Sequence, residues 1–271
     1  MHCTLISDLD EDQELDIQDR GLHYGDGLFE TMLLNNGQIK YWPEHFNRLS
    51  LSARRLDMMC PEQQWFEEKL KPYFDLRQGL IIKIILTRGS GGRGLDLPKK
   101  MSANVYLYKY IINNPIDQQV KASISEVTLP LNRNLAGLKH LNRLDYVLAT
   151  KELKNRAEFN EALLFDNNGF IIESIVNNFF FVKRNTVFTP SLEMSGVNGV
   201  MRNLILKNLK QIQKEVKIGY YSKHDVLSAD ECFLCNSVHG VRPVIQIENI
   251  KFTTGPITQD LQKIFYGHSG N

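Results

Sequence analysis

Four short segments of the 271-residue chain contain the residue types that covalent and acid–base chemistry requires. In chain order they are YGDGLFET (residues 24–31), EHFNRL (44–49), GLKHLNRL (137–144) and a glutamate followed by NNFFF (173 and 177–181). Lys139 could supply a nucleophilic amine, Arg48 a planar fork for an anion, and Glu173 a carboxylate for a nearby cation. Taken singly, each has an ordinary structural explanation, because most charged side chains lie at the surface. Their order and spacing therefore carry more weight than any one of them.

A glycine-rich stretch, GSGGRG at residues 89–94, matches the G-x-G-x-x-G pattern of dinucleotide-binding loops. That motif needs a helix directly after the glycines, because the phosphate binds at the helix N-terminus. Pro98 and a predicted strand follow instead, so we reject a nicotinamide site here. The pattern favours a flexible loop that carries Arg93 into a site, and a plain surface loop is the alternative.

Cys232 and Cys235 have the C-x-x-C spacing of redox pairs and of half a metal site. The residues around them are typical of an extended strand, in which positions three apart point to opposite faces. No second Cys or His pair completes a metal set. We therefore predict a buried strand over residues 231–236 and no metal site.

The composition is that of an ordinary globular protein, with 42% hydrophobic and 23% charged residues. The formal net charge of +1 gives no basic surplus, which disfavours a nucleic-acid-binding protein. No apolar run approaches the roughly 18–20 residues that cross a bilayer. The N-terminus turns acidic after residue 7 and lacks the basic and apolar regions of a secretory signal. We expect a cytoplasmic protein that binds neither membrane nor nucleic acid.

Hydrophobic periodicity predicts a mixture of helices and strands rather than a regular βαβ series. Helices are expected at residues 43–59, 62–74, 142–156 and 199–214 and after residue 256. Strands are expected at residues 80–87, 104–112, 120–128, 161–166, 170–173, 179–182, 187–189, 231–236 and 244–247, and part of 21–34 is extended. A short linker at residues 112–117 divides an N-terminal α/β lobe (1–112) from a C-terminal lobe (118–271) that contains Lys139.

Together the four segments resemble the class IV aminotransferase family, the fold-type IV enzymes that use pyridoxal 5'-phosphate (PLP). The resemblance runs from about residue 20 to residue 243. TRGSGGRG (87–94), residues 138–144 and GVNGVMR (196–202) are similar in particular to the aminodeoxychorismate lyase branch. The resemblance implies a two-lobed α+β fold like that of D-amino-acid aminotransferases, with mixed or antiparallel sheets and flanking helices. It also implies a PLP cofactor, a small-molecule substrate and a homodimer.

The same resemblance implies roles for individual residues. Lys139 would hold the cofactor through its amine and later move a proton, Arg48 would bind the cofactor phosphate, and Glu173 would lie against the pyridine nitrogen. Further expected phosphate ligands are the backbone amides of Val200 and Met201 and the hydroxyl of Ser237. The expected substrate-binding residues are Phe29, Thr31, Arg88 and Arg93.

The reaction could be the lyase reaction or a transamination. Aminodeoxychorismate has its carboxylates on the ring and on the enolpyruvyl arm, away from the amine, so cations remote from the cofactor would suit it, with Arg93 preferred to Arg88. D-amino-acid aminotransferases use an Arg-x-His pair on the corresponding stretch, and a Tyr where Phe29 stands here. Arg88-Gly-Ser90 and Arg93-Gly-Leu95 lack that His, and Phe29 replaces that Tyr. Both differences disfavour a D-amino-acid aminotransferase. A branched-chain aminotransferase is harder to exclude, because the residues of an apolar substrate pocket do not form a recognisable sequence motif.

Overall fold

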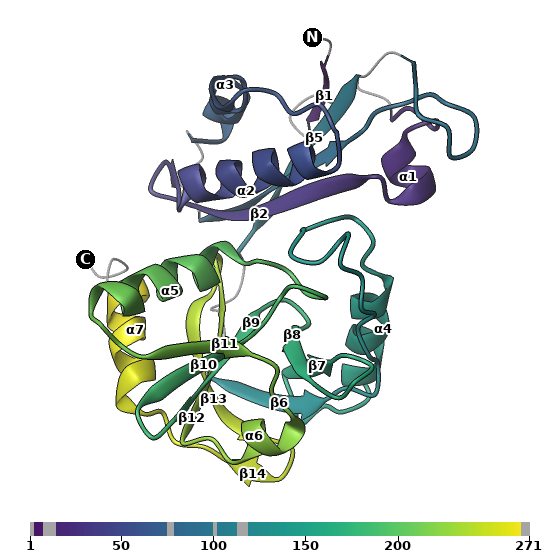
Figure 1. Cartoon of the computed structure of the whole chain (residues 1–271). Helices are drawn as coiled ribbons and strands as arrows, with labels where there is room; N and C mark the ends of the chain where they lie inside the picture. The colour runs from purple at the N-terminus through teal and green to yellow at the C-terminus, as the bar shows by residue number, and fades with distance from the viewer. Residues whose placement is uncertain (1–2, 8–14, 75–78, 100–101, 113–118, 267–271) are drawn as a thin grey trace. The chain divides into compact units, whose positions relative to one another are not determined.

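The computed structural model describes residues 3–7, 15–74, 79–99, 102–112 and 119–266, and the chain forms two compact units (Figure 1). The first unit contains Met1–Pro115 together with Lys139–Asn142. The second contains Ile116–Leu138 and Arg143–Asn271. The linker predicted at residues 112–117 lies outside the described residues except for Ile112. Lys139 was expected in the C-terminal lobe, whereas the segment Lys139–Asn142 groups with the first unit.

The first unit is built on a sheet with the strand order β1-β5-β4-β2-β3. Its strands are β1 (Cys3–Ser7), β5 (Ala103–Ile111), β4 (Leu80–Thr87), β2 (Gly27–Asn35) and β3 (Gln38–Ile39). β1 pairs with β5 in parallel, and the other neighbours are antiparallel. Helix α2 (Trp42–Arg55) runs along β2 (Figure 1), and α3 (Gln63–Phe74) adds the buried Phe66, Leu70 and Tyr73 to the core. Burial alternates along β4, so one face of the sheet is core and the other, here called the functional face, is half-buried.

The second unit is built on a larger sheet, ordered β11-β10-β9-β12-β13-β6-β7-β8, with β14 (Ile250–Lys251) paired to β13. An additional pairing of Glu173 with Asn178 joins β8 to β9, so the strands from β9 round to β8 form a closed ring. The ring strands are β9 (Asn178–Lys183), β12 (Glu231–Asn236), β13 (Gly240–Ile247), β6 (Val120–Ile124), β7 (Glu161–Phe165) and β8 (Ile171–Ser174). Beyond the ring lie β10 (Thr186–Pro190) and β11 (Val216–Gly219). Helices α4 (Leu144–Leu153), α5 (Val200–Gln211), α6 (Lys223–Leu227) and α7 (Pro256–Tyr266) complete this unit.

The α+β class with mixed sheets is confirmed, and most predicted elements are present. β4 spans the predicted residues, and the 161–173 hairpin forms as β7 and β8. The helix predicted to residue 59 ends at Arg55, and the one predicted to residue 214 ends at Gln211. Left-handed residues, Asp57 and Gln213, follow these two ends, and helical backbone cannot continue through them.

The C-x-x-C stretch forms the predicted buried strand. Cys232 and Cys235 lie on β12 with 2% and 1% of their surface exposed, and both are free thiols. Among the described residues, no group of three or more His, Cys, Asp and Glu side chains is arranged to hold a metal ion. No helix within the described ranges is long and apolar enough to cross a membrane.

Asp19 joins the segment before β2 to two inner strands, β4 and β5, of the first unit's sheet. Its carboxylate accepts hydrogen bonds from the Thr87 hydroxyl (2.7 Å), the Asn104 amide (2.7 Å) and the Tyr106 hydroxyl (2.6 Å). It also accepts one from the backbone N–H of Gly21 (2.6 Å). The carboxylate is 3% exposed, so these four donors replace its hydration. Burial and the Asp19 carboxylate together raise the pKa of Tyr106 above its ordinary value, which keeps its hydroxyl a donor.

We predict that Asp19→Asn destabilises the protein, because an amide replaces one acceptor oxygen by a donor that faces other donors. Loss of one hydrogen bond to a buried charged group costs about 1.5–3 kcal/mol. Urea unfolding followed by circular dichroism measures this difference. Asp96→Asn is the control, because the Asp96 side chain is exposed. Equal midpoints for the two variants would contradict the role given to Asp19.

Candidate active site

Lys139 is attached to β2 by main-chain hydrogen bonds. The backbone N–H of Phe29 donates to the carbonyl oxygen of Lys139 (2.9 Å), and the N–H of Leu141 donates to the carbonyl oxygen of Gly27 (3.0 Å). Leu28 and His140 form the antiparallel bridge between them. A Cβ on Gly27 would lie 2.7 Å from both a Leu141 methyl group and the Leu86 carbonyl oxygen, so only glycine allows this approach. These bonds explain why the lysine segment groups with the first unit.

The amino groups of two lysines lie against the ring of Phe29. The Nζ of Lys139 is 4.3 Å from the ring centroid, and the Nζ of Lys83 is 4.9 Å from it. Lys83 is also 5.5 Å from the centroid of Tyr108. Phe29 pairs with Ile85, and Lys83 pairs with Thr31 and Tyr108, so these side chains share one sheet face. Lys83 was not among the predicted site residues, although its alternation with buried Ile82 and Ile84 could have indicated it.

Arg48 is oriented by a buried carboxylate on β2. Its Nε donates to Glu30 Oε1 (2.8 Å), its Nη2 donates to Glu30 Oε2, and His45 Nδ1 lies 2.6 Å from Oε2. Burial alone would raise the pKa of Glu30, but the charges of Arg48 and His45 outweigh it and hold the pKa at about 2. Burial lowers the pKa of His45 despite Glu30, and the nearby Arg48 and Lys139 lower it further. Glu30 and His45 belong to the quoted motifs, but the sequence analysis gave them no role.

Arg88 has a structural role, which argues against its prediction as a substrate ligand. Its Nε donates to Asp26 (2.8 Å), and its two terminal nitrogens donate to the carbonyl oxygens of Asp57 and Leu56 (2.9 Å each). The side chain is 8% exposed. Arg88 therefore caps the C-terminal end of α2, where carbonyl groups lack helical partners.

Arg93 is exposed on a loop without a helix, and its predicted role as a substrate ligand stays a prediction. Four glycines in this stretch (Gly89, Gly91, Gly92 and Gly94) have positive φ angles. No helix follows the glycines between residues 91 and 99, as the rejection of a dinucleotide site expected. Thr31 lies beside Lys83 on the functional face and is half-buried.

The second unit holds Glu173 in a buried, donor-rich position at the point where the ring closes. Its Oε1 accepts from the Tyr146 hydroxyl (2.6 Å), and its Oε2 accepts from the Asn178 amide (3.1 Å) and the Val197 N–H (3.0 Å). Burial first, and then the negative charge of Glu173, raise the pKa of Tyr146 well above its ordinary value. Tyr146 thus stays protonated and donates. The carboxylate, 3% exposed, is held in one orientation.

Helix α5 begins three residues after Val197, whose backbone N–H donates to this carboxylate. Val200 and Met201 are its first residues, both buried, and Gly199 provides no side-chain cap. A Cβ on Gly199 would fall 1.9 Å from Asn178 Oδ1, so a larger residue would displace the amide that holds Glu173. Arg202, in the same first turn, is 6% exposed, and its Nε has no hydrogen-bond partner within the described part of the chain. Uncapped N–H groups and a buried guanidinium suit a phosphate.

Ser237 lies in the turn that joins β12 to β13, in the second unit. The Asn236 side chain accepts from the backbone N–H groups of Val238 (3.0 Å) and His239 (2.6 Å), which fixes this turn. Ser237 is half-buried. The hydroxyl predicted as a phosphate ligand is therefore carried by a turn of fixed shape, and its role stays a prediction.

The donor sets of the two units fit the chemistry of PLP. The first unit supplies a primary amine and an oriented arginine, Lys139 and Arg48. The second supplies a helix N-terminus for an anion and a buried carboxylate, Glu173, that can accept from a protonated ring nitrogen.

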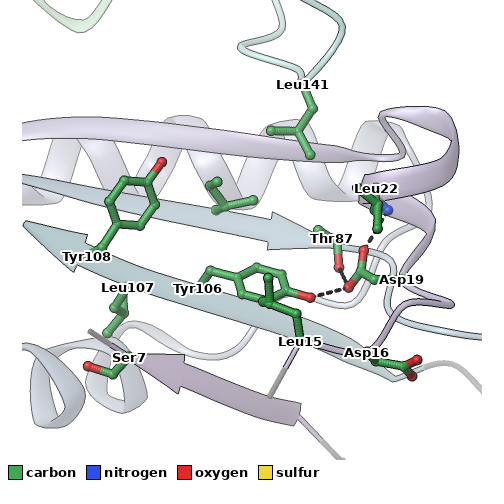
Figure 2. A pocket seen from close by; sticks show the side chains of 12 residues that line it. Ser7, Leu15, Asp16, Asp19, Leu22, Thr87, Tyr106, Leu107, Tyr108 and Leu141 are labelled. Carbon is green, nitrogen blue, oxygen red and sulfur yellow. Dashed lines mark hydrogen bonds between the residues drawn. The ribbon is translucent and has the colours of Figure 1, made fainter. Parts of the chain in front are cut away.

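A cavity of about 530 Å³ lies over the functional face of the first unit's sheet. Figure 2 shows Leu15, Leu22, Tyr106, Tyr108 and Leu141 around it, with Asp19 at one end bonded to Thr87 and Tyr106. Ile85, the partner of Phe29, also lines it. A volume of this size accommodates a small molecule, and its apolar walls would hold a hydrocarbon ring or side chain.

Comparison with known proteins identifies the family. The model of the family described as amino-transferase class IV matches residues 27–247. The aminodeoxychorismate lyase of Vibrio harveyi is 34% identical over 253 residues, which cover 90% of this chain and 93% of that protein. The crystal structure of 4-amino-4-deoxychorismate lyase from Pseudomonas aeruginosa superposes with a TM-score of 0.87 at 31% identity, covering 97% of this chain and 98% of that one. The branched-chain-amino-acid aminotransferase of Escherichia coli is 26% identical over 280 residues, 95% of this chain and 88% of that protein. The chain therefore belongs to the class IV amino-transferase family.

Proposed function

We propose that this enzyme is a PLP-dependent carbon–oxygen lyase that converts 4-amino-4-deoxychorismate to p-aminobenzoate and pyruvate, a step of folate biosynthesis. The structural observation that carries the proposal is the amino group of a second lysine, Lys83, beside Lys139 on Phe29. A substrate whose carboxylates lie away from its amine needs cations other than those that hold the cofactor, and Lys83 can serve as one of them. Similar proteins from Vibrio harveyi and Pseudomonas aeruginosa bear this name, which supports the same reaction.

In this proposal Lys139, Arg48 and Glu173 are the cofactor-binding side chains. Arg48, the first-turn amides of Val200 and Met201, and Ser237 bind its phosphate. When bound, PLP accepts the electron pair that is released as the C–H bond at the amine-bearing carbon breaks. Glu173 keeps a negative charge at the pyridine nitrogen and so favours its protonated form.

Lys139 is the proposed acid–base group. Its neutral amine takes the proton from the amine-bearing carbon of the substrate. The enolpyruvyl group then leaves from the neighbouring carbon as the C–O bond breaks, the ring becomes aromatic, and the departing oxygen takes up a proton. Phe29 positions the Lys139 side chain, and Lys83 and Arg93 bind the two carboxylates that an amino acid would not place there. Thr31, next to Lys83, lies on the same face and completes the proposed substrate-binding set.

Transamination of a branched-chain amino acid is the second candidate. The apolar walls of the first-unit cavity, formed by Leu22, Ile85 and Leu141, would suit a hydrocarbon side chain. Similarity to the aminotransferase of Escherichia coli points the same way. The family resemblance also supports a cytoplasmic homodimer, which sedimentation velocity of the purified protein would test.

We expect borohydride reduction of the PLP-loaded protein to place the label on the Lys139 peptide. Lys139→Ala should lose both the covalent label and nearly all turnover. Lys139→Arg keeps the positive charge but cannot form an imine, so it should fail equally. Mass spectrometry of the digest checks the first result. A label on a different lysine would end the assignment.

Glu173→Gln should lower turnover by about 100-fold or more, since it removes an oriented charge from the reacting group. Cofactor affinity should change much less, because the phosphate ligands are retained. Arg48→Ala should show the opposite order, with PLP affinity falling first. Titration of the apoenzyme with PLP, followed by steady-state kinetics, separates the two effects. Parental turnover in Glu173→Gln would show that its carboxylate is structural.

A lyase needs no amine acceptor, so p-aminobenzoate and pyruvate should form in equal amounts without an added keto acid. Lys83→Met should lower kcat/KM for aminodeoxychorismate by roughly one to two powers of ten, the effect of losing one charged hydrogen bond. Its effect on any amino-acid substrate should be smaller. Lys207→Met is the control, because Lys207 is exposed on α5. Rapid conversion of leucine with 2-oxoglutarate, and no p-aminobenzoate, would instead favour the aminotransferase.

A further inference from the structure

The loop that carries Arg93, residues 89–98 and here called the glycine loop, has a tightly constrained backbone. A Cβ on Gly89 would lie 1.9 Å from the Ser102 carbonyl oxygen, and one on Gly92 would lie 2.0 Å from the Asp96 carbonyl oxygen. The N–H of Asp96 donates to the carbonyl oxygen of Arg93 (3.2 Å) and closes a turn at the tip. The glycines thus allow a compact conformation rather than only providing flexibility.

Arg20 is the side chain that holds this conformation. Its Nη1 donates to the carbonyl oxygens of Gly94 (3.2 Å) and Asp96 (2.9 Å), on the C-terminal side of Arg93. The backbone N–H of Arg20 donates to the carbonyl oxygen of Gly89 (3.0 Å) at the start of the loop. One residue therefore bonds the loop on both sides of Arg93. The Arg20 side chain is 5% exposed, and its guanidinium carbon is 4.8 Å from the centroid of the Tyr24 ring.

Arg20 is itself held in place through Asp26. The Oδ2 atom of Asp26 accepts from Arg20 Nε (2.9 Å) and from Arg88 Nε (2.8 Å). Burial would raise the pKa of Asp26, but the two guanidinium groups outweigh it and lower the pKa. Since Arg88 is bonded to the end of α2, the glycine loop is linked through three charged side chains to a helix of the core. A lysine could not reproduce this arrangement, because an ammonium group lacks the planar fork.

We propose that Arg20 is a positioning residue that fixes the glycine loop and thereby sets where Arg93 meets a substrate carboxylate. This inference rests on the proposed function, in which Arg93 binds a remote carboxylate. Arg20 acts through the loop, so its loss should affect the binding of a substrate with that carboxylate rather than the proton transfer at Lys139.

The first test needs no activity. Trypsin cleaves after arginine, and the Arg93–Gly94 bond lies between the two places where Arg20 holds the loop. Arg20→Met should make this bond at least about tenfold more sensitive to trypsin, the factor expected when one charged hydrogen bond is lost. Arg54→Met is the matched control, because Arg54 is exposed on α2 of the same unit. Equal cleavage of the parent and Arg20→Met at Arg93 would overturn the inference.

The second test is kinetic. Arg20→Met should raise KM for aminodeoxychorismate by roughly tenfold with little change in kcat. Adding Arg93→Ala to that variant should then cost little more, because the two residues act on one interaction. Full additivity of the two effects, or an equal fall in kcat, would contradict a role through Arg93. Arg20→Lys should not restore the parental KM.

Two glycine variants test the same role without removing Arg20, so that the test does not depend on the folding of Arg20→Met. Gly92→Ala disturbs the loop without removing the Arg20 side chain, since the new Cβ would lie 2.0 Å from the Asp96 carbonyl oxygen and 3.3 Å from Arg20 Nη1. Gly94→Ala has a similar left-handed φ of 60° but no atom within 4 Å of the new Cβ. Gly92→Ala should therefore reproduce the rise in KM, and Gly94→Ala should show much less of it; equal effects would contradict the inference. If the parent makes no p-aminobenzoate, the proposed function fails, and the trypsin result still decides whether Arg20 holds the loop.

Discussion

The main-chain pairing of Lys139–Asn142 with β2 is the constraint on which the candidate site depends. Two backbone hydrogen bonds place Lys139 over Phe29, before any side-chain interaction is considered. β2 then organises a second cluster from its other face, where Glu30 orients Arg48. Because side chains alternate along a strand, Phe29 and Glu30 serve different clusters although they are neighbours in sequence. One strand therefore positions both the proposed nucleophile and the proposed phosphate ligand.

The two buried carboxylates are held by different kinds of donor. Glu30 pairs with the guanidinium of Arg48, so much of its charge is balanced within the protein. Glu173 accepts from Tyr146, Asn178 and a backbone N–H, which are neutral donors. These donors fix the orientation of the Glu173 carboxylate, and Glu30 fixes the orientation of an arginine.

Sequence patterns predicted the long strands well, because an apolar, β-branched run such as residues 80–87 strongly favours a buried strand. Short elements were missed: α1 (Arg20–Tyr24), β11 and α6 each have too few residues for a period to be recognised. Motif order selected Lys139, Arg48 and Glu173. Lys83, Tyr146 and Arg20 were not found, and Arg88 was given a substrate role, because these assignments depend on strand register and on contacts between distant segments. Register and such contacts are properties of the folded chain that no local pattern contains.

Closure of the second unit's ring at Glu173 and Asn178 has a consequence for how this family diverges. Glu173, which is proposed to interact with the cofactor ring, also forms the bridge between β8 and β9. Replacing it would therefore disturb both the reactivity and the joining of these two strands. The half-buried side chains of Thr31, Lys83 and Tyr108, on the sheet of the first unit, are under no such double constraint. Mutations can accumulate there without opening a sheet. Side chains of this face can therefore change while the strand pairing at Glu173 is kept, and the relatives of this chain include both lyases and aminotransferases.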